Sequence, residues 1–130
     1  PIEGYIEGGI TASFSSRGPS LRTANKPDIA VPGGAGGSGQ KPQLIYGPTS
    51  GILDSVIDGI VDEWAPLRGT SMAAPVYSGI LALAAETNPT VMWTQVARAN
   101  QIAGRRGGPW KLLDQGWGVV DATAFLHSLT

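Results

Sequence analysis

A long, largely hydrophobic stretch occupies residues 76–85, with the order Val-Tyr-Ser-Gly-Ile-Leu-Ala-Leu-Ala-Ala. Small or apolar side chains fall on nearly every face of a helix drawn through it, which predicts a central helix that needs covering on several sides. We expect this helix to run over residues 71–86, because Asn88 and Pro89 would end it. The helix is too short to cross a bilayer, and small polar residues interrupt it, so we expect no membrane partner.

The rest of the second half predicts three further elements. A helix is expected over residues 92–102, closed by Gly104, whose backbone freedom suits a helix end. A short strand at residues 118–120 and a last helix at residues 121–129 should follow it.

The first half is expected to be extended and rich in turns. Strands are predicted at residues 2–6, 28–31 and 41–46, and the strand at 28–31 should be buried; proline stops the last two. The glycine-rich residues 33–39 have too few side chains for regular structure and predict a surface loop. A phosphate-binding role would need the lysine and the strand-loop-helix setting of a P-loop, which do not follow.

The segment of residues 52–64 allows two interpretations. Its apolar residues recur at helical spacing opposite an acidic face, which favours an amphipathic helix. Its glycines, Gly51 and Gly59, also permit a loop that leads into an extended segment. The acidic residues do not have the alternate spacing of an EF-hand loop, so we expect a solvated acidic face and no metal site.

Composition excludes several classes of function. The chain has 130 residues, a net charge of −1 and 15% charged residues, which gives no electrostatic basis for binding nucleic acid. It has no cysteine, so a disulfide framework and a thiolate metal site are both excluded. The pair Arg105-Arg106 is too small a cluster to change this, and we expect it in a solvated loop between helices.

Ser71 is the candidate catalytic residue. It lies in Gly69-Thr-Ser-Met-Ala-Ala-Pro75, where a glycine-preceded turn places a serine at the very start of the predicted central helix. Unpaired N–H groups and the positive end of the helix dipole meet there, an environment that suits a nucleophile whose attack produces an oxyanion. A Gly-Thr-Ser sequence alone also fits an ordinary helix N-cap. The esterase pattern G-x-S-x-G fails, because Ala73 stands at the second glycine.

Four sequence blocks resemble the subtilisin-like serine proteases, the subtilase family. They are the GTSMAAP block around Ser71, an FSSRGP turn, a KPDIAVPG strand and turn, and a GWGVVDA segment, at residues 69–75, 14–19, 26–33 and 116–122. Their order along the chain is the order of the family. The resemblance implies that Ser71 is the nucleophile of a peptidase, acting through an acyl-enzyme on peptide or protein substrates, with no cofactor. It implies an α/β fold with a mainly parallel sheet flanked by helices, of which this chain supplies only part.

The residues that should assist Ser71 are not in the sequence before it. Family members have their aspartate, histidine and oxyanion asparagine upstream of the FSSRGP turn, whereas this chain has no histidine before Ser71, and Asn25 comes after that turn. We therefore expect residues 1–130 to be the C-terminal segment of a single catalytic domain. Its partner would be the N-terminal part of the same domain, bound noncovalently. The family resemblance also implies a secreted or extracellular location.

Two alternatives to this interpretation stay open. His127, the single histidine, would have the wrong order along the chain for the family's general base, and we expect it to be a polar residue near the end of the last helix. The whole chain could also be a subtilase remnant without activity, serving as a binding or assembly module. Copurification of a second polypeptide that contains the aspartate, histidine and asparagine would separate these functions.

Overall fold

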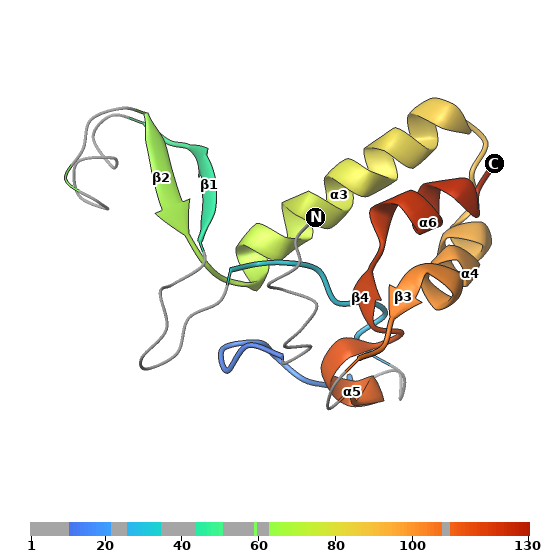
Figure 1. Ribbon diagram of the computed structural model, residues 1–130, viewed down its shortest axis with the longest axis horizontal. Coiled ribbons are helices and arrows are strands. Elements are labelled where there is room, and N and C mark those ends of the chain that lie inside the picture. Colours follow the sequence, from blue (N-terminus) through green and yellow to red (C-terminus); the bar gives the residue numbers. More distant parts are fainter. Residues whose placement is uncertain (1–10, 22–25, 35–43, 51–58, 60–62, 108–109) are drawn as a thin grey trace.

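The computed structural model describes residues 11–21, 26–34, 44–50, 59, 63–107 and 110–130. Its longest element is helix α3, Thr70–Thr87. Helices α4, Trp93–Ala103, and α6, Ala122–His127, lie beside the C-terminal half of α3, whereas a two-stranded hairpin projects beyond its N-terminal end (Figure 1). The predicted helices at 71–86, 92–102 and 121–129 are thus confirmed, with ends that differ by one or two residues.

The core forms where α3, α4 and α6 meet. Phe125 of α6 is fully buried at its centre, and its ring meets the Tyr77 ring edge-on, with centroids 6.1 Å apart. The cluster around it consists of Ile80, Ala84, Val96, Ala99, Ala103 and Leu129. Three of these are alanines, which allow the helix backbones to approach the ring closely. Burying one such aromatic side chain stabilises the fold by about 1.5–3 kcal/mol.

A short sheet connects α4 to α6. Strand β3, Gly104–Arg105, pairs antiparallel with β4, Val119–Val120. A Cβ atom at Gly104 would lie 2.2 Å from the Trp117 carbonyl oxygen, so this approach requires glycine. The predicted strand at 118–120 is confirmed. Between the two strands lies the one-turn helix α5, Leu112–Gln115.

Arg105 and Arg106 are exposed between helices, as expected, but Arg105 lies in a short strand and both make specific contacts. Arg105 lies in β3 and donates from Nε to the Asp121 carboxylate at 2.9 Å. The Arg106 guanidinium lies over the rings of Trp110 and Trp117, 5.0 and 5.2 Å from their centroids, and donates to the Trp117 carbonyl. The Asp121 carboxylate therefore forms an ion pair with Arg105, and the two indole rings form cation–π contacts with Arg106.

The hairpin precedes α3 directly. Strand β1, Ile45–Pro48, pairs antiparallel with β2, Trp64–Leu67. The strand expected at 41–46 is therefore found from residue 45, and residues 41–43 lie outside the described part. Of the segment 52–64, residues 52–58 and 60–62 also lie outside it, while Trp64 begins a strand, as the extended alternative requires.

The expected parallel sheet does not appear in the described part of the chain, where both sheets are antiparallel pairs. The predicted strand at 28–31 forms two isolated bridges, one antiparallel from Ile29 to Gly116 and one parallel from Ala30 to Val119. Helices with small sheets are compatible with an α/β fold. The expected strand at 2–6 and the loop residues 35–39 lie outside the described residues.

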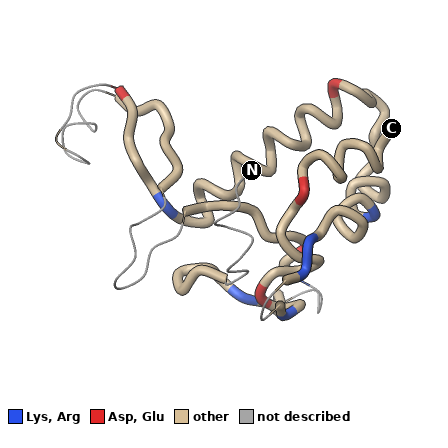
Figure 2. Tube along the Cα trace, viewed as in Figure 1, with Lys and Arg blue, Asp and Glu red and all other residues tan. Residues whose placement is uncertain are grey.

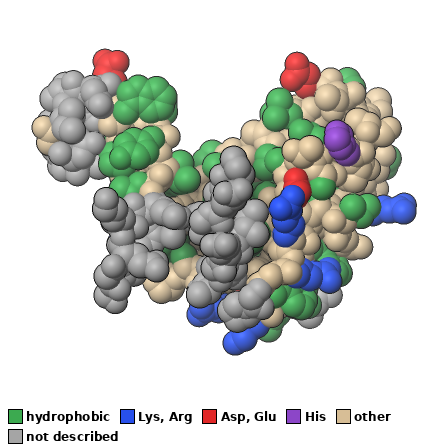
Figure 3. Space-filling view, viewed as in Figure 1, with side chains coloured by type: hydrophobic (Ala, Val, Ile, Leu, Met, Phe, Trp, Pro, Cys, Tyr) green, Lys and Arg blue, Asp and Glu red, His purple; other side chains and the backbone are tan. Residues whose placement is uncertain are grey.

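Helix α3 is covered on one face only. Within its length, Ile80 and Ala84 are the buried residues, whereas Leu83 is 51% exposed and Val76 is 36% exposed. Figure 3 shows hydrophobic side chains at the surface along this side of the molecule and on the hairpin. No helix in the described part of the chain is long and apolar enough to span a membrane.

Asp121 makes the fold sensitive to acid. Its Oδ1 caps α6 by accepting from the Ala124 amide at 3.1 Å, and its Oδ2 pairs with Arg105. These contacts, the Ala124 hydrogen bond first, lower the pKa of Asp121 below its ordinary value of 3.8. The stability that the carboxylate contributes is therefore present above that value and is lost as the pH falls through the lower pKa of the folded state.

Asp121→Asn should reduce the free energy of unfolding at pH 7, and the difference from wild type should shrink as the pH falls below about 4. Urea denaturation at a series of pH values measures this. Glu86→Gln, at an exposed carboxylate on α3 that lies apart from Asp121, is the matched control and should leave the pH profile unchanged. A constant difference at all pH values would contradict the assignment.

Candidate active site

Ser71 is the second residue of α3 and is exposed to solvent. The turn before it is made by Gly69, whose φ of 149° favours glycine. The Gly69 carbonyl accepts from the Met72 amide at 3.0 Å and from the Ala73 amide at 3.2 Å. Within the described part of the chain, the Thr70 and Ser71 amides and the Ser71 hydroxyl have no hydrogen-bond partner. The site thus presents a hydroxyl beside free donors at the positive end of a helix.

A close contact between two backbone segments fixes this turn. The Gly69 amide donates to the carbonyl oxygen of buried Gly33 at 2.7 Å. A Cβ atom at Gly33 would lie 2.6 Å from the Gly69 carbonyl oxygen and 3.0 Å from the Ala73 Cβ. Because only glycine fits there, the KPDIAVPG segment can approach the first turn of α3 and hold it. In the sequence, only the Pro32-Gly33 pair at the end of the predicted strand pointed to this contact between Gly33 and Gly69.

A cavity of about 320 Å³ adjoins the first two turns of α3. Thr70, Ala73, Ala74 and Tyr77 of α3 form one wall. The other walls come from residues 11–16, from residues 27–34, and from Asp114, Gln115 and Val119. Ser71 is not among the residues that line it, although Thr70 before it and Ala73 after it are.

A buried polar pair links α3 to α4 beside this cavity. The Tyr77 hydroxyl donates to the Asn100 Oδ1 at 2.9 Å, and Asn100 is 1% exposed. Burial raises the pKa of Tyr77 above its ordinary value of 10.0, although the Asn100 hydrogen bond lowers it, so the hydroxyl stays a donor at neutral pH. No motif in the sequence predicts this pair. Its only signal was an asparagine among alanines on the buried face of a helix.

His127 lies far from Ser71, as its place in the sequence suggested. It is exposed at the last position of α6. The C-terminal end of α6 adjoins the C-terminal end of α3, since Asn88 donates to the Leu129 carbonyl at 3.3 Å. That end of α3 is about 25 Å from Ser71 along the helix axis. The imidazole therefore cannot take the Ser71 proton in this arrangement.

No group of three or more histidine or acidic side chains suited to a metal occurs among the described residues. The acidic residues between 52 and 62 lie outside them. The described residues thus place a serine hydroxyl at a helix start, beside amides that have no partner among them and without a base from them. This arrangement fits a nucleophile and also fits an ordinary helix start.

Comparison with known proteins identifies the family. The model of the subtilase family, peptidase S8, matches residues 4–118. The chain is 37% identical over 82 residues to the subtilisin-like protease SBT4.4 of Arabidopsis thaliana, covering 62% of this chain and 10% of that protein. It is 37% identical over 103 residues to SBT2.4 of the same plant, covering 72% and 11%. It is 36% identical over 80 residues to the serine protease AprX of Bacillus subtilis, covering 60% and 16%.

The chain therefore belongs to the subtilase family, as its four sequence blocks indicated. Its similar proteins are named as subtilisin-like or serine proteases, so the family is one of proteases. The matched regions span between 10% and 16% of the lengths of these relatives.

Gly33→Ala should displace the first turn of α3, because the added methyl group has no room beside Gly69 and Ala73. We expect a loss of about 1–3 kcal/mol in the free energy of unfolding. Hydrogen exchange at the Gly69, Met72 and Ala73 amides should also become faster. Gly47→Ala in β1, where a Cβ atom meets nothing within 4 Å, is the matched control. Equal protection of these amides in both variants would contradict this role for Gly33.

Proposed function

We propose that this chain is the nucleophile segment of a serine endopeptidase. The observation that supports this most is Ser71, exposed at the start of α3 beside the free amides, in a chain of a protease family. In the proposed reaction the Ser71 Oγ attacks a peptide carbonyl, and its proton passes to a histidine oriented by an aspartate. The histidine passes this proton to the leaving amine as the peptide bond breaks, which leaves an acyl-enzyme, and water then hydrolyses the ester to free the acid and restore the Ser71 hydroxyl.

The free amides would act at the oxyanion stage. The carbonyl oxygen gains negative charge as the tetrahedral intermediate forms, and the Ser71 N–H, at the positive end of α3, is available as a donor. In the family an asparagine side chain completes this oxyanion site. The histidine, aspartate and asparagine would come from the N-terminal part of the same domain, held noncovalently against this chain.

The uncovered surfaces suggest where that part would bind. Helix α3 has an apolar exposed face that includes Val76 and Leu83, and the cavity adjoins the first two turns of the same helix. Covering both surfaces would remove apolar area from water and bring the added residues to the end of α3 that contains Ser71. The proposed substrates are peptides or proteins, and the proposed location is secreted or extracellular, as the family resemblance implies.

Ser71→Ala should abolish peptide cleavage by the full-length protein, with a loss of at least about a thousandfold in kcat and little change in fold. Hydrolysis of an internally quenched peptide measures the rate, and circular dichroism checks the fold. His127→Ala is the control and should cleave at the wild-type rate. Equal rates for Ser71→Ala and wild type would contradict the proposal, and no cleavage by the wild-type protein would favour an inactive binding or assembly module.

A further inference from the structure

The turn at residues 116–118 packs tightly against two other segments of the chain. A Cβ atom at Gly116 would lie 2.4 Å from the carbonyl oxygen of Asp28. A Cβ atom at Gly118 would lie 2.4 Å from the carbonyl oxygen of Arg105, in β3. Backbone packed this closely transmits strain, so a displacement of the turn also displaces the segments against it.

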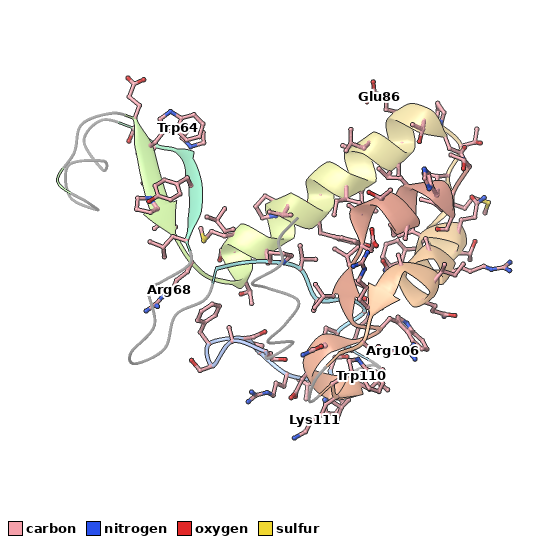
Figure 4. All side chains as sticks on the ribbon, viewed as in Figure 1. Trp64, Arg68, Glu86, Arg106, Trp110 and Lys111 are labelled. Atoms are coloured by element: carbon pink, nitrogen blue, oxygen red, sulfur yellow. The ribbon has the colours of Figure 1, made fainter. Side chains whose placement is uncertain are left out.

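Two side chains hold this turn in place. Trp110 donates from Nε1 to the Gly116 carbonyl at 3.1 Å. Arg106 donates from Nε to the Trp117 carbonyl at 3.2 Å. The Arg106 guanidinium also lies over the rings of Trp110 and Trp117, 5.0 and 5.2 Å from their centroids (Figure 4). Arg106 therefore joins both rings to the backbone of the turn.

Backbone hydrogen bonds connect the turn to the segment at residues 28–31. The Trp117 amide donates to the Asp28 carbonyl at 3.0 Å. The Ala30 amide donates to the Gly118 carbonyl at 2.8 Å, and the Ala30 carbonyl accepts from the Val120 amide at 3.0 Å. Three bonds within a few residues fix the position of this segment relative to the turn.

The same segment continues into the contact that holds the first turn of α3. Gly33 is three residues beyond Ala30, a span of at most about 11 Å. Its carbonyl accepts from the Gly69 amide at 2.7 Å, and Ser71 follows two residues later. A continuous series of contacts thus runs from Arg106 to the start of the helix that contains Ser71.

We propose that Arg106 is a positioning residue for Ser71. It acts through the turn at 116–118 and the segment at 28–33, and the inference rests on the proposed protease function. Without the guanidinium, the turn and the segment bonded to it gain freedom, and the Ser71 hydroxyl leaves the geometry of attack more often. Misplaced reacting atoms slow the chemical step more than they weaken substrate binding.

Arg106→Gln in the full-length protein should lower kcat about three- to tenfold while KM changes by less than about twofold. Hydrolysis of an internally quenched peptide measures both constants, at a temperature where circular dichroism shows every variant fully folded. Arg106→Lys keeps a cation over the rings and should restore part of the lost kcat. Hydrogen exchange at the Gly69 amide, a readout independent of activity, should become faster in Arg106→Gln.

The control separates Arg106 from a general loss of positive charge or stability. Most lysines and arginines of the described chain lie around α5 and the β3–β4 pair (Figure 2). Arg105→Gln makes the same charge change at the neighouring exposed residue, whose side chain bonds to Asp121. It should lower the free energy of unfolding and keep the wild-type kcat and the wild-type exchange at Gly69.

The outcomes distinguish the inference from the proposed function. If wild type cleaves the peptide and Arg106→Gln matches it in kcat and in Gly69 exchange, the positioning role fails and the protease function stands. An equal loss of kcat in Arg105→Gln would also overturn the positioning role. If wild type cleaves no peptide and behaves as Ser71→Ala does, the proposed function fails and the inference fails with it.

Discussion

Helix α3 is apolar around its circumference, and this constraint shapes the rest of the structure. The helix packs Ile80 and Ala84 against Phe125 and the alanines of α4, and this contact forms the core. Its other faces leave Val76 and Leu83 in contact with water. A cavity also adjoins the first two turns of the helix, so this part of its surface is not fully covered by the described residues. A helix of this kind is stable as the centre of a larger domain. The chain belongs to the subtilase family and matches only 10% of the length of one relative, and both findings fit this interpretation.

The same helix connects packing to chemistry. Its C-terminal half is held by the Phe125 cluster, and its middle by the hydrogen bond between Tyr77 and Asn100. Its first turn is held by the backbone contact of Gly33 with Gly69. A helix fixed at both ends keeps Ser71 in one position, which the proposed role as a nucleophile requires.

Sequence patterns predicted the parts of this fold that depend on local rules. Hydrophobic periodicity, Asn88-Pro89 and Gly104 predicted helices α3, α4 and α6, and the sequence blocks singled out Ser71. The parts that depend on distant contacts were missed. Arg105 and Arg106 pair with Asp121, Trp110 and Trp117, which the chain brings close only after folding. The expected parallel sheet is not found in the described part of the chain, where a single parallel bridge joins Ala30 to Val119. The role of Ser71 as nucleophile stays a prediction.

The central claim is that Ser71 becomes reactive only when the uncovered face of α3 meets the segment that provides the base. Fluorophosphonate probes test it directly, because they label a serine that is activated by a base and an oxyanion site. The 130-residue chain alone and the full-length protein are treated identically, and mass spectrometry locates the label. The account predicts labelling at Ser71 in the full-length protein and none in the chain alone. Labelling of the chain alone, or of another serine in the full-length protein, would contradict it.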